Sequence, residues 1–501
     1  MNKLLINRYV LISSAIFSLI LSCIIHSQAD VLNLDGICYL KSAEAMKISI
    51  RAASHLCEQA KWPFYSILIY ILSTTIKISY VSAAFLLNSF FTMLSVVSFI
   101  FIIQLLTDKI RVSWFAMIVI LLAHQFNSVR DYVIRDHGFW AFYLLSIVFI
   151  LQYTQREHIK YAIAWSACLM VATLFRIEGA IFLLFMPMIL LLDYKQPIVT
   201  RIKAFAYLNC LSAMVLVCLG MWLWQHHSND IRRLQEIYFQ IVHGWSFIIE
   251  TLQNKARILG QSILGIEGEH DSTLVFIITL LVYYFINIVA NVSLINAILI
   301  GYAWIKKAAK LTHPTSYILW SYILLNSIIT SSFLAEHMFL SKRYLLALTL
   351  VLLLWVPFAL ESLILQYDRM KLPFILAISL FIISSISPLI HHGTSKLYIK
   401  EAGAWLSEHT PASAKLYSNN SLILYYSQHF GLDIFNTIEQ YKKIDIFDKR
   451  QWEKYDFVAI FIPHEEKNTL KNKLALLHII PIKLFENNRD DQIIIYKGQR
   501  G

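Results

Sequence analysis

The sequence predicts a polytopic α-helical membrane protein with about 11 transmembrane helices, interfacial helices and a small α/β domain at the C-terminal end. Its 501 residues are 57% hydrophobic and only 15% charged, and the mean hydropathy is +0.58, whereas about a quarter of the residues in soluble domains are charged. Apolar runs of about 17–25 residues recur as far as position ~390, and each can cross a hydrocarbon core of ~30 Å. Because that core offers the backbone no hydrogen-bond partners, these runs must be helices.

Basic residues in the connectors set the predicted topology. These residues gather in connectors that all fall on one side of the membrane, and the positive-inside rule makes that side cytoplasmic. The net charge of +11 is therefore explained by membrane topology, and no nucleic-acid partner is expected. The first run could also be a signal peptide, but its length and the later spans favour a retained helix. The N-terminus is expected in the cytoplasm and the C-terminal domain on the periplasmic or extracellular side of a bacterial inner membrane. The predicted spans lie near 9–26, 81–106, 112–127, 137–153, 160–175, 179–194, 204–224, 273–303, 314–332, 344–364 and 372–390.

Two external loops, 27–80 and 225–272, are long. If residues 62–80 crossed the membrane, every later basic connector would change side, so we expect an interfacial helix that begins at Pro63. Residues 35–58 predict an amphipathic helix on the membrane surface, with an apolar stripe made of Tyr39, Ala43, Met46, Ile50, Ala53 and Cys57. Cys38 and Cys57 share this loop, and they either form a disulfide in an oxidising compartment or remain free.

The pattern changes at about residue 391, which divides a membrane domain, 1–390, from a small α/β domain, 391–501. Asn487–Asp491 is typical of a hairpin turn. Strand-like runs at 415–418, 432–435, 457–462, 482–486 and 492–497 alternate with helical runs at 400–408, 421–429 and 465–477.

Charged residues avoid the span centres, where a proton- or ion-coupled transporter would keep them. They gather instead at the predicted outer ends, and carboxylates beside guanidiniums at one membrane face suggest a reaction on a lipid-borne anion. The residues concerned are Asp30, Asp35, Arg130, Asp131, Arg135, Asp136, Arg176, Glu178, Glu336, His337, Lys342 and Arg343.

The order of several short motifs resembles the GT-C superfamily of membrane glycosyltransferases, over nearly the whole chain. The bacterial branch is the most similar: the 4-amino-4-deoxyarabinose lipid A transferases, the protein O-mannosyltransferases and the RgtA/B/C/D-like proteins. The resemblance implies inverting transfer of a sugar from a polyprenyl-phosphate carrier to an envelope glycan, lipid or protein. The motifs are Asn33-Leu34-Asp35-Gly36-Ile37-Cys38-Tyr39-Leu40, Lys61-Trp62-Pro63-Phe64-Tyr65, Arg135-Asp136, Leu174-Phe175-Arg176-Ile177-Glu178-Gly179, Lys342-Arg343-Tyr344 and Glu401-Ala402-Gly403-Ala404-Trp405-Leu406.

Asp35 is the expected catalytic base. Transfer to a hydroxyl needs a carboxylate aligned with the acceptor, and a partly desolvated carboxylate at the interface is a stronger base. Asp35 lies one turn before Tyr39, at the head of the apolar stripe. The alternative is that Asp35 or Asn33 only caps this helix, and one residue could do both.

Arg176 and Arg343 suit the leaving phosphate, because guanidinium binds phosphate bidentately and stays charged. Alternatively, both arginines only extend their side chains so that the charged ends reach the membrane interface. Asp136 would support an acceptor, a metal or Arg135, or be a plain ion-pair partner, and Glu178 would orient Arg176. Lys342 and His337 are further candidates.

The sequence implies no nucleotide cofactor, because it lacks glycine-rich phosphate loops. A divalent metal is compatible with the resemblance, but the acidic pair that the family sometimes has in the first loop corresponds to Asp35 alone in this sequence, so metal use stays open. Glu267–Asp271 has metal-ligand chemistry without diagnostic spacing and is expected to be a solvated turn. Two other functions fit the same features: a transporter or flippase of a lipid-linked saccharide, and a non-catalytic membrane scaffold.

Overall fold

The computed structural model describes residues 2–226, 232–265, 269–366, 375, 379, 394–442, 446, 448–469 and 481–498. Its chain separates into two compact units. The first, here called the helical unit, comprises Met1–Cys23, Asn88–Arg130 and Arg135–Ile390. The second, the sheet unit, comprises Ile24–Leu87, Asp131–Ile134 and His391–Gly501. The unit that contains the C-terminal sheet therefore also contains the first long loop, which the sequence assigned to a membrane domain 1–390.

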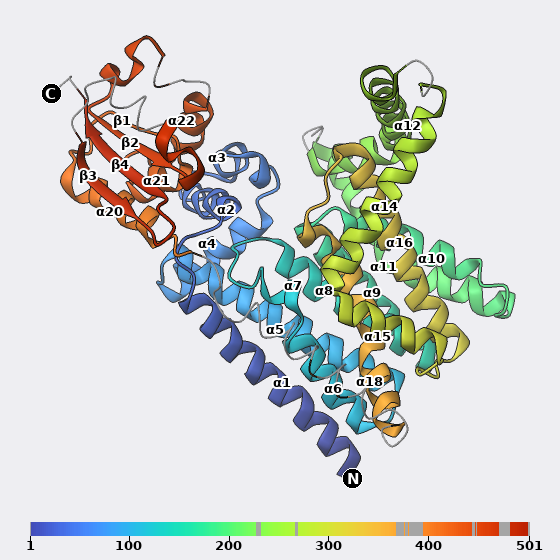
Figure 1. Cartoon of the computed structure of the whole chain (residues 1–501). Coiled ribbons are helices and arrows are strands. Elements are labelled where there is room, and N and C mark those ends of the chain that lie inside the picture. The colour runs from blue at the N-terminus through green and yellow to red at the C-terminus, as the bar shows by residue number, and fades with distance from the viewer. Residues whose placement is uncertain are drawn as a thin grey trace. The chain divides into compact units, whose positions relative to one another are not determined.

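The chain is a multi-pass membrane protein by the length and composition of its helices. Seven of the described helices are long and apolar enough to span a bilayer, and five shorter apolar helices accompany them. In the helical unit α8 packs along α9, while α10 and α11 pack on α9 and α16 packs on α10 (Figure 1). The helices are α1 (Asn2–Ser27), α5 (Tyr80–Leu106), α6 (Ile110–Leu121), α7 (His124–Asn127), α8 (Asp136–Arg156), α9 (Ile159–Phe175), α10 (Glu178–Leu191), α11 (Ile198–His226), α12 (Arg232–Leu259), α14 (Ser272–Val292), α15 (Leu294–Ile305), α16 (His313–His337), α17 (Leu346–Leu352) and α18 (Val356–Leu365), with short turns η2 (Gly260–Leu264), η3 (Glu269–Asp271), η4 (Lys342–Leu345) and η5 (Leu353–Trp355).

Most of the predicted spans coincide with helices. The predicted span 273–303 is broken in two, because Ser293 has a φ of 76° and its hydroxyl accepts from Asn296 N at the start of α15. The predicted span 112–127 ends at Leu121, and α7 follows as a separate turn. The loop 225–272 contains the long helix α12. Of the predicted span 372–390 only residues 375 and 379 are described, so the total of about 11 stays a prediction. In the segment Glu267–Asp271, residues 267 and 268 lie outside the described residues, and the other three form η3.

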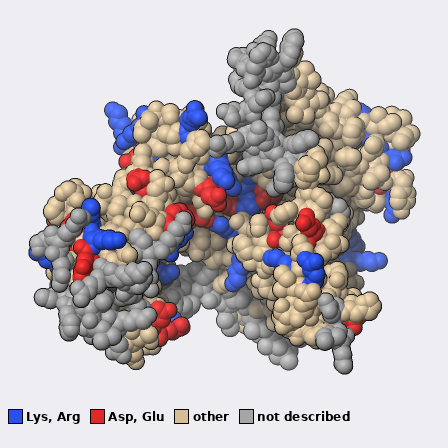
Figure 2. All heavy atoms as spheres, turned by 90° about the horizontal axis from the view of Figure 1, so that it is seen from above, with Lys and Arg blue, Asp and Glu red and all other residues tan. Residues whose placement is uncertain are grey.

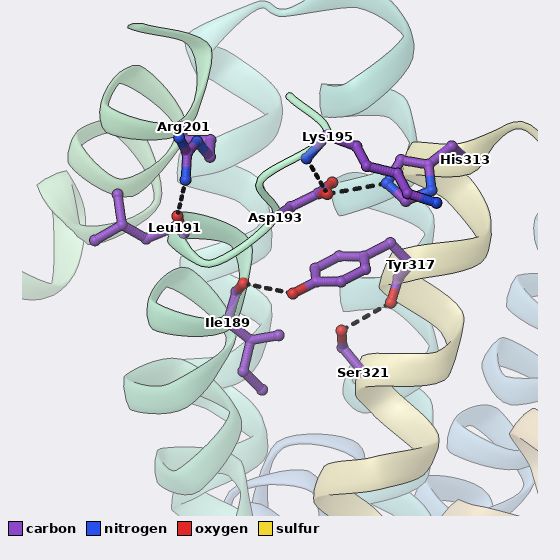
Figure 3. Close-up of polar contacts among 8 residues, drawn as sticks. All are labelled: Ile189, Leu191, Asp193, Lys195, Arg201, His313, Tyr317 and Ser321. Carbon is purple, nitrogen blue, oxygen red and sulfur yellow. Dashed lines mark hydrogen bonds and ion pairs between the residues drawn. The ribbon is translucent and has the colours of Figure 1, made fainter. Parts of the chain in front are cut away.

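The basic connectors meet at one end of the helical unit. Gln155 Nε2 donates to Leu105 O at 3.0 Å, Lys203 Nζ lies 3.3 Å from Glu157 Oε2, and His313 Nε2 lies 2.9 Å from Asp193 Oδ1. Figure 3 shows this last contact, with Tyr317 donating to Ile189 O and Arg201 donating to Leu191 O beside it. A shared end for these connectors agrees with the sidedness that the basic residues predict.

The first loop of the sheet unit folds against protein. It forms α2 (Leu34–Ala45), α3 (Ile50–His55), η1 (Glu58–Ala60) and α4 (Phe64–Ile76), and a disulfide joins Cys38 to Cys57. The prediction of one continuous helix over 35–58 is wrong, because residues 46–49 break it. Half of the predicted stripe is buried in protein: Tyr39 is 4% exposed and lies edge-on to Tyr65 of α4, whereas Ile50 is 65% exposed.

The C-terminal residues form a four-stranded sheet in the order β1-β2-β4-β3. The parallel pair is β1 (Leu416–Ser418) with β2 (Phe457–Ile462), while β4 (Gln492–Lys497) runs antiparallel to β2 and to β3 (Pro481–Glu486). Alternation in β4 buries Ile493 and Ile495 in one core cluster and Ile494 and Tyr496 in the other. The helices here are α20 (Leu397–His409), α21 (Ser421–Tyr426) and α22 (Ile434–Tyr441), with η7 (Asp448–Lys454) and η8 (His464–Glu466).

Strand prediction failed at 432–435, where α22 begins. The run Leu432–Phe435 is apolar at three of its four residues, whereas Ile434, Thr437, Ile438 and Tyr441 follow helical spacing over eight residues. Residues of the first loop pack against α20 and α21 of the sheet unit. The hydroxyl of Tyr426 accepts from Leu32 N at 2.9 Å, and Ile37 is part of the core cluster with Leu406 and Ile423.

Candidate active site

A cluster of charged and aromatic side chains lies where three segments of the helical unit meet, here called the arginine cluster: Asp136, Phe139, Arg176, Glu178, Arg343 and Tyr344. Asp136 is the first residue of α8 and is 3% exposed. Arg176 lies in the two-residue connection between α9 and α10, and Glu178 begins α10. Arg343 and Tyr344 belong to η4, before α17. α8 has 21 residues and is thus about 30 Å long, so this cluster is at the opposite end of α8 from Glu157.

Arg176 is held by two carboxylates. Its Nε donates to Glu178 Oε1 at 3.0 Å, its Nη2 contacts the same oxygen, and its Nη1 contacts Asp136 Oδ1. Burial lowers the pKa of Arg176, but Glu178 and Asp136 raise it more, and the pKa stands well above its ordinary value. Arg176 is therefore a permanent cation whose donors are largely engaged within the protein.

Two aromatic rings enclose the same guanidinium. The Cζ of Arg176 lies 4.6 Å from the ring centroid of Tyr344 and 5.9 Å from that of Phe139. Arg343 Cζ lies 5.2 Å from the Tyr344 ring, so one ring contacts two guanidiniums. These contacts are of the cation–π type and also restrict where each guanidinium can point.

Three guanidiniums act on the carboxylates of the cluster. Arg135 and Arg343 both act electrostatically on Asp136, as Arg176 does, and Arg135 acts on Glu178 as well. Cations gathered in this way can attract an anionic ligand. Figure 2 shows one face of the molecule, on which blue and red side chains lie beside one another within a mostly tan surface.

Two glycines allow the helices to approach at this cluster. A Cβ at Gly138, two residues after Asp136, would lie 2.4 Å from the Phe175 ring. A Cβ at Gly179 would lie 2.6 Å from the backbone nitrogen of Thr173. Both glycines flank residues that bind Arg176, so close packing of α8, α9 and α10 fixes the separation of Asp136, Arg176 and Glu178.

Lys342 and His337, the weaker predicted residues, lie beside the cluster. Lys342 precedes Arg343, and its carbonyl accepts from Asn291 Nδ2 at 2.6 Å. His337, at the end of α16, packs on Phe333, which contacts the Tyr344 ring edge-on at a centroid distance of 4.6 Å. Arg130, another charge of the predicted outer ends, instead anchors α1: its Nη1 donates to Ser18 O and Ser22 Oγ, each at 2.9 Å.

Asp35 and Tyr39 belong to the sheet unit. Asn33 occupies the N-cap position of α2 and makes no side-chain capping bond, while Asp35 lies in the first turn and is half-buried. Asn33 instead accepts from Val133 N at 2.8 Å. The alternative that Asn33 caps the helix is therefore wrong, and Asp35 lies two positions after the N-cap. Its role as a base stays a prediction, as does its convergence with Arg176 and Arg343.

The sequence did not single out Tyr344 or Phe139, although both are central to the cluster. The only signal for Tyr344 was its place after Lys342 and Arg343 in a motif, and Phe139 looked like one more apolar span residue. Among the residues that the structure describes, no group of three or more His, Cys, Asp and Glu side chains could hold a metal ion. Asp136, the expected metal candidate, is engaged by Arg176.

Comparisons with known proteins gave structural matches only. No family model and no curated protein matches the sequence. Three solved structures of the oligosaccharyltransferase of Archaeoglobus fulgidus are similar in fold. The structure with zinc and sulfate has 12% identity and a TM-score of 0.47, and the match covers 80% of this chain and 55% of that one, so the chain spans about half its length. The complex with an inhibitory peptide and a dolichol-phosphate has 12% identity, a TM-score of 0.49, and coverage of 94% and 71%. The structure tethered to an acceptor peptide has 10% identity, a TM-score of 0.47, and coverage of 94% and 70%.

Proposed function

We propose that this chain is a membrane glycosyltransferase that moves a sugar from a polyprenyl-phosphate carrier to an envelope glycan, lipid or protein on the outer face of a bacterial inner membrane. The observation that carries the proposal is the arginine cluster. It concentrates permanent positive charge at one end of a bundle of membrane-length helices, at the opposite end of α8 from the basic connectors. The order of motifs shared with membrane glycosyltransferases supports the same reading.

In the proposed reaction, an acceptor hydroxyl attacks the anomeric carbon while the bond from that carbon to the phosphate oxygen breaks. The phosphate leaves with the bonding electron pair, and the hydroxyl proton passes to a carboxylate, for which we propose Asp35. Attack opposite the leaving group inverts the anomeric configuration. Negative charge grows on the phosphate as the bond breaks, and fixed cations that stabilise this growing charge lower the barrier.

The contacts of Arg176 refine the roles that the sequence suggested. Glu178 and Asp136 occupy three of its nitrogen atoms, so we propose that Arg176 mainly fixes the site. For the main ligand of the phosphate we propose Arg343, which contacts the same Tyr344 ring, with Lys342 next to it in the chain. Tyr39 and His337 remain supporting residues in this proposal.

The test is a transfer assay with the full chain in lipid nanodiscs. Polyprenyl-phosphate sugars and envelope acceptors from cells that lack the protein would be incubated with wild type, Asp35→Asn and Arg343→Ala. We expect wild type to release polyprenyl phosphate and form a glycosylated acceptor, and both variants to insert normally but lose transfer. Retained activity in Asp35→Asn would remove Asp35 from the mechanism.

A flippase of a lipid-linked saccharide would use the same cations, so a second readout separates the two functions. In proteoliposomes, a flippase makes the intact lipid-linked sugar accessible from the other leaflet without a new glycosidic bond. Such movement without transfer, equal in wild type and Asp35→Asn, would overturn the proposed enzyme. If neither activity depends on Arg343, Lys342 or Arg176, and only deletion after residue 397 has an effect, the scaffold function is favoured.

A further inference from the structure

A cavity of about 290 Å³ lies in the sheet unit, at the end of β1, and belongs to none of the machinery described above. The β1–α21 turn forms one side of it and the end of α22 forms the other. Its lining includes Tyr417, Asn419, Ser421, Leu424, Tyr441 and Lys442. A volume near 300 Å³ is at the small end of the range for ligand sites, which suits a compact ligand.

The turn beside this cavity is rigid. Asn419 bridges to β2, because its Oδ1 accepts from Phe461 N at 2.8 Å and its Nδ2 donates to Phe461 O at 2.9 Å. Asn420 caps α21 through a bond from Leu422 N at 2.9 Å. A side of the cavity fixed by three bonds of this kind is formed before any ligand arrives, which lowers the entropy lost on binding.

The aromatic wall is fixed as well. Tyr417 is only 3% exposed, so the half-buried Tyr441 is the ring that a ligand can contact. The centroids of the two rings lie 4.9 Å apart, and the Tyr441 hydroxyl donates to Leu416 O at 2.6 Å. Tyr441 also packs against Tyr455, with a centroid distance of 5.6 Å. Aromatic faces carry partial negative charge, and they therefore attract the weakly positive C–H groups that one face of a sugar ring presents.

The polar members of the lining complete the chemistry. Ser421 offers a hydroxyl at the start of α21, and the exposed Lys442 carries three donors, of which one contacts Glu439 Oε1 at 2.9 Å. Hydroxyl and amide groups match the hydroxyls of a sugar, and an ammonium matches a carboxylate or phosphate substituent. An apolar ligand would make no use of these groups, and a bare anion would make no use of the Tyr441 ring.

We propose that the cavity beside β1 binds an acidic saccharide unit, a sugar ring that carries a carboxylate or phosphate. That this saccharide belongs to the envelope rests on the proposed function, but binding at this site does not. The site is distinct from the arginine cluster, which lies in the helical unit and is proposed to bind the lipid phosphate.

The experiment measures binding of galacturonate, and of galactose as its neutral counterpart, to the full chain in nanodiscs by ligand-observed NMR titration. No donor lipid is present, so failure of transfer cannot affect the result. We expect wild type to bind galacturonate roughly tenfold more tightly than galactose, as a charge-assisted bond would provide. Lys442→Gln should abolish that preference, and Ser421→Trp, which fills the cavity, should abolish both interactions.

Lys454→Gln is the matched control, because Lys454 is also exposed and pairs with the residue three positions before it, Gln451. It should bind as wild type does. The proposal is overturned if wild type binds neither sugar, or if Lys442→Gln keeps the full preference for galacturonate. It is equally overturned if Ser421→Trp, with an unchanged thermal unfolding temperature, binds galacturonate like wild type.

Discussion

The guanidinium of Arg176 stacks on the ring of Tyr344, with the Cζ atom 4.6 Å from the ring centroid. Arg343 contacts the same ring, at 5.2 Å. Tyr344 therefore connects a cation that is tied to two carboxylates with the cation that we propose for the leaving phosphate. The ring, rather than the hydroxyl, makes both of these contacts.

Replacing the ring should weaken donor binding. Tyr344→Leu removes two cation–π contacts of about 0.5–2 kcal/mol each, and we expect kcat/KM for the polyprenyl-phosphate donor to fall by roughly 10-fold or more. Most of the change should appear in KM for the donor, because Arg343 loses its orientation. Tyr344→Phe keeps the ring and should restore wild-type KM within about threefold. Equal loss in the Phe and Leu variants would show that the hydroxyl, and not the ring, is needed.

Asp136→Asn should disrupt the cluster more strongly than its small change in size suggests. The substitution leaves the buried Arg176 with one carboxylate, and loss of a buried ion-pair partner costs about 3–5 kcal/mol. We expect transfer to fall at least 100-fold, together with a lower unfolding temperature in nanodiscs. Asp193→Asn is the matched control, since Asp193 is also a buried carboxylate with a side-chain partner, His313, but at the other end of the unit. A similar loss of transfer in both variants would indicate general destabilisation.

Periodicity and charge predicted the helices well, because long apolar runs can only be helices in a bilayer. They also placed Arg176, Glu178 and Asp136 at connected helix ends, where the structure joins them. The pattern failed where local signals were ambiguous: the break at Ser293 depends on one residue with a positive φ, and the short apolar run 432–435 overlaps the start of α22.

The amphipathic stripe of 35–58 shows a more general limit. An apolar face at helical spacing predicts that the face will be covered, but not whether lipid or protein covers it. Ile37 and Tyr39 are covered by protein, through the core of the sheet unit and through Tyr65 of α4. Likewise, Phe139 and Tyr344 have no sequence signature of their role, because stacking on a guanidinium depends on which helices become neighbours. The role of Asp35 remains a prediction for the same reason.

Gly138→Ala should impair the cluster without touching a charged group. The added methyl would lie 2.4 Å from the Phe175 ring, so α8 and α9 must separate or the ring must rotate. Overpacking of this kind typically costs about 1–3 kcal/mol, and Arg176, the next residue after Phe175, should move with it. We expect a lower unfolding temperature and reduced transfer. Gly301→Ala is the control, because nothing lies within 4 Å of a Cβ there and α15 should tolerate it. Wild-type transfer and stability in Gly138→Ala would refute the packing argument.

Reduction of the disulfide between Cys38 and Cys57 should loosen the first loop of the sheet unit. The bond closes a loop across a sequence separation of 19 and links α2 to the residue before η1. Loss of such a bond typically costs about 2–4 kcal/mol. We expect Cys38→Ser/Cys57→Ser to show faster hydrogen exchange in 34–60 and a lower unfolding temperature, and a reductant to produce the same change in wild type only. Cys210→Ser, at an exposed free cysteine, should leave both measurements unchanged. If a reductant destabilises the double serine variant as much as wild type, the stabilisation comes from elsewhere and the disulfide is dispensable.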